Sequence, residues 1–133
     1  MNTRTEKGKF DLEERLIEFA AKVFEIVDSV FDSKAGNHIA GQLVRSGSNP
    51  ALHYGEAQSA ESRKDFIHKL QVLLKELKES RAVFKLIIRV PLSEKIEFTK
   101  SVLSECEELI SIFAKSISTA KENMRKELIK SVK

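Results

Sequence analysis

The last third of the chain carries an unbroken heptad repeat. Its positions alternate in steps of four and three residues, and nearly all of them are apolar or small. This period of 3.5 residues places them on one stripe of an α-helix and predicts burial against neighbouring helices at a shallow crossing angle. The positions are Leu92, Ile96, Thr99, Leu103, Cys106, Ile110, Phe113, Ile117, Ala120 and Met124.

Three further helices are predicted upstream of this repeat. Asp11 and Glu14 form a capping-box pattern at the start of the first helix, and Gly36 suits a left-handed stop after it. Pro50 predicts a kink or break in the second helix, which is the least periodic. Ser62 begins the third helix. The expected helices cover about 11–32, 37–60, 62–90 and 93–128, and the last is expected to fray after Met124.

Helices joined by short connections pack with alternating direction. We therefore predict an all-α fold, an antiparallel up-down-up-down four-helix bundle, as a single domain over residues 1–133. The low proline content, with only two in the chain, agrees with this fold class. One cysteine excludes an internal disulfide, and no apolar run is long enough to span a bilayer. We expect a cytoplasmic protein that has no membrane contact.

The third helix carries two apolar rows. Its main stripe is expected to face the core, and a second row points well over a right angle away. An exposed row of this kind favours an interface, here between copies of the chain, and so predicts a homo-oligomer. The alternative is a wide core face with a few scattered surface residues. The main stripe is Phe66, Leu70, Leu73, Leu77, Phe84 and Ile88, and the second row is Val72, Val83, Leu86 and Val90.

The same helix carries a basic row, defined as Lys78, Arg81, Lys85 and Arg89. These residues step by three, four and four along the helix with no acid among them, so they share one face. Repeated in an oligomer, the row would attract the phosphates of RNA or DNA. The alternatives are a solvated face, or pairing across subunits with the acidic first helix.

The residues give little support for a catalytic site or a metal site. His38, His53 and His68 are 15 residues apart in each step, which is not a helical metal-ligand spacing, so we expect no metal and no cofactor. Cys106 lies on the core stripe and is expected to be a small core residue. Arg63 and His68 match the Arg-x4-His pattern of HEPN ribonucleases, which makes a metal-free ribonuclease a minor alternative.

Three segments together carry a family resemblance: Gln42 to Ala57, Ala60 to Leu70, and Leu77 to Arg81. They resemble the bacterial four-helix-bundle proteins that are often encoded in intervening sequences of ribosomal RNA genes and were once labelled S23 ribosomal proteins. The resemblance implies a bundle, a homopentamer and no known enzymatic activity. Related accessory proteins bind nucleic acid and a reverse transcriptase. The matching polar residues are Arg45, Glu56, Glu61, Arg63, Lys64, Asp65 and Lys69.

Two expectations follow from this resemblance. Arg45 is expected to pair with a carboxylate of the third helix inside the bundle. The chain departs from the usual family pattern at Asn49-Pro50 and at His53, and these departures affect only the local geometry of the second helix. The function expected is that of a non-enzymatic, homo-oligomeric protein that binds RNA or other nucleic acid through phosphates. The alternative is a structural or adaptor oligomer that binds a protein partner.

Overall fold

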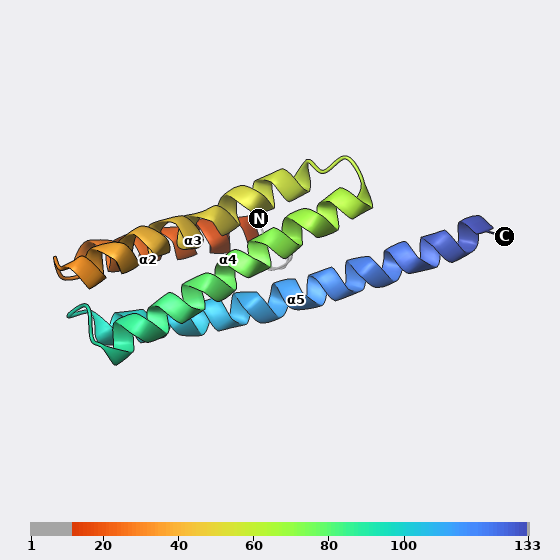
Figure 1. The fold of residues 1–133 in the computed structure, drawn as a ribbon. Coiled ribbons are helices and arrows are strands. Elements are labelled where there is room, and N and C mark those ends of the chain that lie inside the picture. Colours follow the sequence, from red (N-terminus) through yellow and green to blue (C-terminus); the bar gives the residue numbers. More distant parts are fainter. Residues whose placement is uncertain (1–11, 133) are drawn as a thin grey trace, which may run out of the picture.

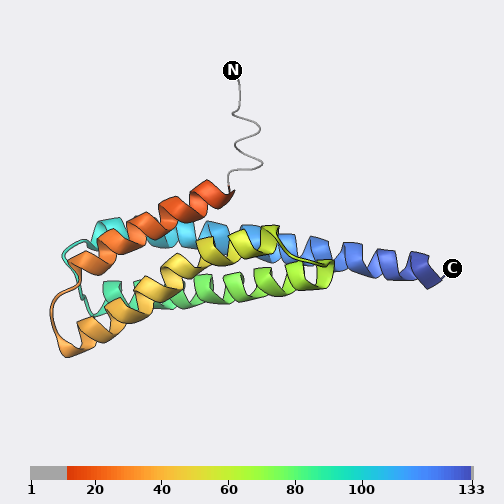
Figure 2. The same cartoon turned by 90° about the horizontal axis from the view of Figure 1, so that it is seen from above.

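The computed structural model describes residues 12–132, which form four helices. Successive helices run in opposite directions and lie side by side, and the far end of the last helix projects beyond the others (Figures 1 and 2). This confirms the predicted all-α, antiparallel four-helix bundle. The helices are α2 (Leu12–Ser29), α3 (Lys34–Gln58), α4 (Arg63–Arg89) and α5 (Ile96–Val132).

α4 packs on both α3 and α5, whereas α2 packs mainly on α3 and less on α5. Leu70, Leu73 and Leu77 of the predicted stripe are at most 1% exposed. Phe84 of the same stripe is fully buried and meets Phe19 of α2 edge to face, with 6.1 Å between ring centroids. The heptad pattern of α4 therefore located the inner face of this helix correctly.

The connection between α2 and α3 differs from the prediction. Gly36 is not a left-handed stop, because no described residue has a positive φ. It lies in the first turn of α3, where Ser33 caps the helix by accepting the Gly36 N–H at 2.9 Å. A Cβ on Gly36 would lie 2.3 Å from the carbonyl oxygen of Phe31, so close approach rather than backbone conformation requires glycine. The predicted cap at Asp11 lies outside the described residues.

α3 runs through Pro50 as one helix, so the predicted break at this residue is wrong. Proline in a helix interior costs roughly 3 kcal/mol because it removes one hydrogen bond and crowds the preceding turn. Pro50 is buried in the bundle, and packing of its helix against neighbours offsets that cost. The predicted start of α4 is confirmed, since Ser62 accepts the Asp65 N–H at 3.0 Å.

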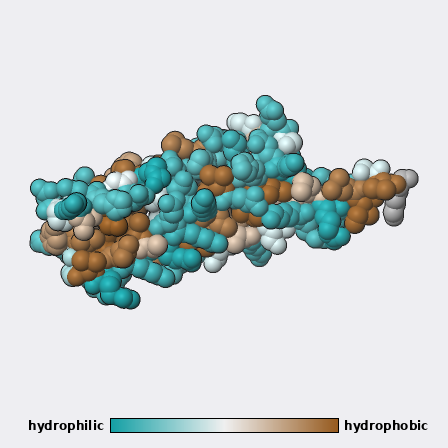
Figure 3. All heavy atoms as spheres, in the orientation of Figure 1, coloured by the Kyte–Doolittle hydropathy of each residue, from teal (hydrophilic) through white to brown (hydrophobic). Residues whose placement is uncertain are grey.

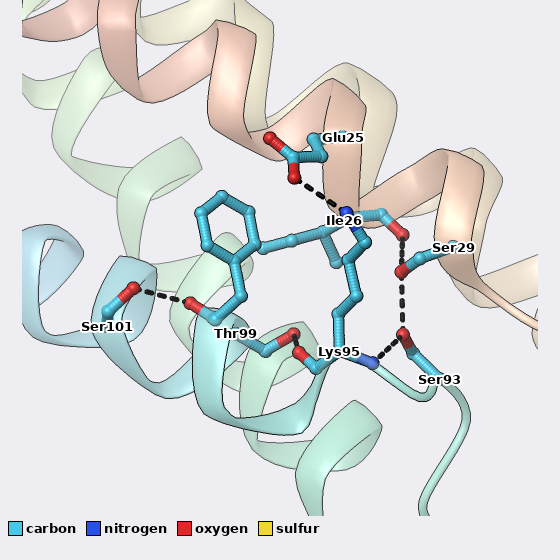
Figure 4. Close-up of polar contacts among 8 residues, drawn as sticks. Glu25, Ile26, Ser29, Ser93, Lys95, Thr99 and Ser101 are labelled. Atoms are coloured by element: carbon cyan, nitrogen blue, oxygen red, sulfur yellow. Dashed lines mark hydrogen bonds and ion pairs between the residues drawn. The ribbon is translucent and has the colours of Figure 1, made fainter.

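A chain of hydrogen bonds joins α2 to the turn before α5 (Figure 4). The Lys95 backbone N–H donates to Ser93 Oγ at 2.9 Å, the hydroxyls of Ser93 and Ser29 are 2.6 Å apart, and Ser29 donates to the Ile26 carbonyl at 2.7 Å. Each hydroxyl can thus donate once and accept once. Lys95 Nζ also lies 2.7 Å from a carboxylate oxygen of Glu25. These contacts hold α2 to α5 at one end of the bundle.

α5 begins later and ends later than expected, at Ile96 and Val132, so the predicted fraying after Met124 is wrong. Its last turns project from the bundle and carry apolar side chains on their surface (Figure 3). Leu128, Ile129 and Val132 are 60%, 50% and 82% exposed.

α2 and α3 approach each other closely at Gly47. A Cβ at this position would lie 2.5 Å from Cγ1 and 2.7 Å from Cγ2 of Val23, which is fully buried. A separation this short forces a shift of one helix or the other. Gly47 is therefore the residue that allows α2 and α3 to pack together.

We expect Gly47→Ala to destabilise the protein by about 1–2 kcal/mol, because overpacking against Val23 outweighs the gain of up to about 1 kcal/mol in helix propensity. Urea denaturation followed by circular dichroism measures the change. Gly41→Ala in the same helix is the control. Nothing lies within 4 Å of a Cβ there, so we expect a small stabilisation.

The cause can be isolated with a double variant. Val23→Ala should cost less stability in the Gly47→Ala background than in the wild type, since it relieves the clash. Equal costs in the two backgrounds would show that Gly47 is not needed for this contact.

Candidate nucleic-acid interface

The basic row lies on the surface of α4. Lys78, Lys85 and Arg89 are exposed and Arg81 is partly buried. At a rise of 1.5 Å per residue the row extends over about 16 Å. Among the ion pairs formed by residues 12–132, none involves a member of the row. The row therefore presents uncompensated positive charge.

The basic row faces the α5 side of α4. Lys78 lines a groove together with Ile117 and Lys121 of α5. Arg81 is near enough to Cys106 of α5 for its charge to lower the pKa of that thiol, although burial dominates and raises this pKa to about 12. Cys106 is fully buried and its Sγ donates to the Leu77 carbonyl at 3.2 Å. Cys106 is thus a core residue, as predicted.

The second apolar row of α4 is only partly exposed. Leu86 and Val90 are 46% and 57% exposed, and Val72 is partly buried. Val83 is only 8% exposed and belongs to the core of the single chain, so its inclusion in an exposed row was wrong. Its burial is by residues of the same subunit. The large exposed apolar side chains here are therefore Leu86 and Val90, whereas the partly buried Val72 lies about 21 Å away along the helix axis.

Arg45 does not pair with a carboxylate of α4, contrary to the prediction. It is exposed and donates instead to Gln42, one turn earlier in α3. The carboxylate of α4 that does face α3 is Glu76, which accepts a hydrogen bond from Asn49 at 3.3 Å. Asn49, where this chain departs from the usual family pattern, thus makes the contact with a carboxylate of α4 that was expected of Arg45.

The other family-motif residues are divided between two helix seams. Glu56 lies 3.5 Å from Lys69 and 3.3 Å from His53, and these contacts lower the pKa of Glu56, with the His53 hydrogen bond as the largest cause. Arg63 makes two hydrogen bonds to Glu127 of α5, at 2.8 and 3.1 Å. The motif therefore ties α3 to α4 and α4 to α5. Asp65 supplies the backbone N–H that Ser62 caps, and Glu61 and Lys64 are exposed.

Arg63 and His68 do not converge within one chain. Five residues of α-helix separate their directions by about 140°, because each residue turns by about 100°. Arg63 is directed to Glu127, and His68 is exposed. This geometry does not place the His68 imidazole beside the guanidinium, whose charged partner is instead the Glu127 carboxylate. Residues 12–132 also contain no group of three or more His, Cys, Asp or Glu side chains suited to a metal ion.

The seam between α3 and α4 contains a buried polar contact that sequence reasoning missed. The hydroxyls of Ser46 and Ser80 are 2.9 Å apart, and both residues are at most 1% exposed. The small-residue run from Ser46 to Ser48 was the available signal, since small side chains allow helices to approach closely. It could not indicate which serine of α4 lies opposite.

Fold and surface together define an antiparallel four-helix-bundle protein with a basic face and an apolar face on one helix. A solved structure with the same fold is a protein with unknown function from the S23 ribosomal protein family of Bacteroides thetaiotaomicron. It is 26% identical, covers 79% of this chain and 96% of its own, and superposes with a TM-score of 0.71. The resemblance to the S23 ribosomal protein family that the sequence predicts is thereby confirmed.

No protein-family model matches the chain, and no curated protein matches it. Within residues 12–132, none of the helices has the length and apolar content needed to cross a membrane.

We expect the Cys106 thiol to be inert in the folded protein at pH 8, because a pKa of about 12 leaves it almost wholly protonated and burial blocks access. Its reaction with Ellman's reagent should proceed only as fast as the protein unfolds, and it should speed up in urea. Rapid modification of the native protein would contradict the buried position.

Proposed function

We propose that this chain is a non-enzymatic, homo-oligomeric, cytoplasmic accessory protein that binds nucleic acid, RNA in the first instance, through phosphate contacts. The observation that carries the proposal is the basic row: four cations on one helix face with no carboxylate partner among residues 12–132. Uncompensated cations in a line release counterions when they meet a phosphate backbone, and this supplies binding free energy.

The chemistry of the row favours binding that tolerates many base sequences. Lysine and arginine contact phosphates, which position a nucleic acid but carry no base information. The chain has no Trp, and its only Tyr, Tyr54, packs edge to face on Phe113 with ring centroids 5.8 Å apart. A base-stacking platform on these residues is therefore unavailable, and affinity should depend chiefly on charge and salt.

Self-assembly is supported by a second apolar face, on α2. Ile17 and Phe24 are seven residues apart on α2 and are 47% and 44% exposed, and Phe31, just after the end of the helix, is 45% exposed. Glu14 and Glu18 are exposed on the same helix. This acidic, apolar face differs from the apolar row of α4, so a contact between them would be head-to-tail and could close into a ring. The family resemblance implies five subunits.

Assembly and phosphate binding can use different sides of α4. Lys69, Glu76 and Ser80 face α3. At about 100° per residue, Leu86 and Val90 together point roughly 100° away from the mean direction of the basic row. The basic row lies on the side toward α5, where Lys78 lines the groove with Lys121. An oligomer built through Leu86 and Val90 would therefore leave the row open to a ligand.

The alternative function is that of an adaptor whose ligand is a protein, such as a reverse transcriptase. The exposure of Leu86 and Val90 favours it, because adjacent exposed apolar side chains often mark protein interfaces. In this case the apolar row, rather than the basic row, would determine binding. The ribonuclease alternative has less support, since Arg63 is already paired with Glu127.

Changing Lys78, Arg81, Lys85 and Arg89 together to Glu should abolish binding of fluorescein-labelled RNA at low salt, measured by anisotropy. For the wild type, the logarithm of affinity should fall with the logarithm of salt concentration, by about 0.7 for each phosphate contact to a single strand. The matched control changes four scattered lysines, Lys22, Lys34, Lys115 and Lys130, to Glu. If both variants lose affinity equally, the basic row is not the binding surface.

Leu86→Asp combined with Val90→Asp should dissociate the oligomer, because a charge in the centre of an apolar contact is left without solvation. Multi-angle light scattering would report the drop in mass, and circular dichroism would confirm an intact bundle. Leu52→Asp on α3, at a residue 63% exposed, is the control. Val83→Asp is unsuitable because it would disrupt the core of the subunit. An unchanged mass would rule out the apolar row as the interface.

A further inference from the structure

A groove between α4 and α5 holds more positive charge than the basic row alone. Its volume is about 380 Å³, and its walls come from both helices. Lys75 and Lys78 of α4 and Lys121 of α5 are exposed at its rim, whereas Leu74 is partly buried and Ile117 is only 7% exposed at its floor. Gln71 completes the lining.

Three lysine side chains line this groove, and no acidic side chain lines it. None of the three lysines takes part in an ion pair of the described residues. Like charges that approach one another repel, and a recess with low-dielectric walls focuses their field. An anion in the groove would remove this repulsion. The lysine ammonium is a compact point charge that suits phosphate from several directions.

The floor of the groove is apolar, which a phosphate alone does not need. A nucleotide has both chemistries, since its phosphate is anionic while its base and sugar present faces that pack on apolar side chains. Leu74 and Ile117 offer such a surface in the same groove as Lys75 and Lys121. A duplex keeps its bases paired and stacked inside, so only an unpaired strand can place a base or sugar on this floor.

We infer that the α4–α5 groove is an anchoring subsite for one nucleotide of a single-stranded nucleic acid. The phosphate meets Lys75, Lys78 and Lys121, Gln71 donates a further hydrogen bond, and the nucleoside lies on Leu74 and Ile117. The strand then continues along α4 over Arg81 and Lys85. This inference rests on the proposed nucleic-acid binding. It adds Gln71, Lys75 and Lys121 to the interface. It also predicts that the groove prefers single strands to duplexes.

The test is the double variant Lys75→Gln with Lys121→Gln, which removes two charges and leaves the basic row intact. Its matched control is Lys22→Gln with Lys34→Gln, which removes the same charge from α2 and α3. Anisotropy titrations use a labelled single-stranded oligouridylate and an RNA duplex of equal length. Circular dichroism checks that each variant is folded.

The groove variant should bind the single strand about tenfold more weakly than the control variant does, with a salt slope smaller by about 0.7 for each lost contact. Its duplex affinity should match that of the control. Equal weakening for strand and duplex would overturn the assignment to single strands.

The outcomes also separate this inference from the proposed function. If the groove variant behaves like its control while charge reversal of the basic row abolishes binding, the groove inference fails and the proposed function stands. If the wild-type protein binds neither RNA, both fail together.

Discussion

Burial of one stripe of α4 against two neighbouring helices organises the molecule. Leu73 and Leu77 are fully buried because α3 and α5 close over them from opposite sides. When a helix is covered on two sides, only part of its surface remains exposed to solvent. Side chains outside the two contact faces must point outward. The basic row and the exposed part of the apolar row are the consequence. The same packing that stabilises the core therefore determines which side chains are available to a ligand.

The contacts of α3 with its neighbours are tightly packed, whereas the contact between α2 and α5 is more polar. Ser46 and Ser80 bury a hydroxyl pair between α3 and α4, and Gly47 allows close packing of α3 on α2. By contrast, α2 and α5 share less packing and are joined by ionic groups. Arg15 contacts Glu105 and Glu108, both at 2.8 Å, and these carboxylates raise the pKa of the guanidinium. Ion pairs near the surface contribute little each, so apolar packing on α3 must hold most of α2 in place.

The separation of charge over the surface gives the two proposed activities room to coexist. Acidic and apolar residues share α2, whereas the unpaired cations lie along α4 and at the adjacent edge of α5. Attraction between these surfaces in neighbouring copies would favour a head-to-tail arrangement. The groove lined by Lys78 and Lys121 is set back between two helices, so a subunit that contacts Leu86 does not need to cover it. A ring of such subunits would repeat the groove at regular intervals.

The sequence by itself determined the helices, their order and most of the inner face of α4 and α5, because the period of apolar residues depends only on local geometry. It also located the basic row, since charges three and four residues apart share a helix face wherever the helix packs. The sequence could not show how much of each helix surface the neighbouring helices cover. Val83 is covered by the same subunit, Arg45 is not drawn into the seam, and Pro50 is tolerated inside α3. Only the tertiary structure brings Lys121 beside Lys75, because residues distant in the chain meet through the crossing of α4 and α5, and that crossing is set by packing throughout the core.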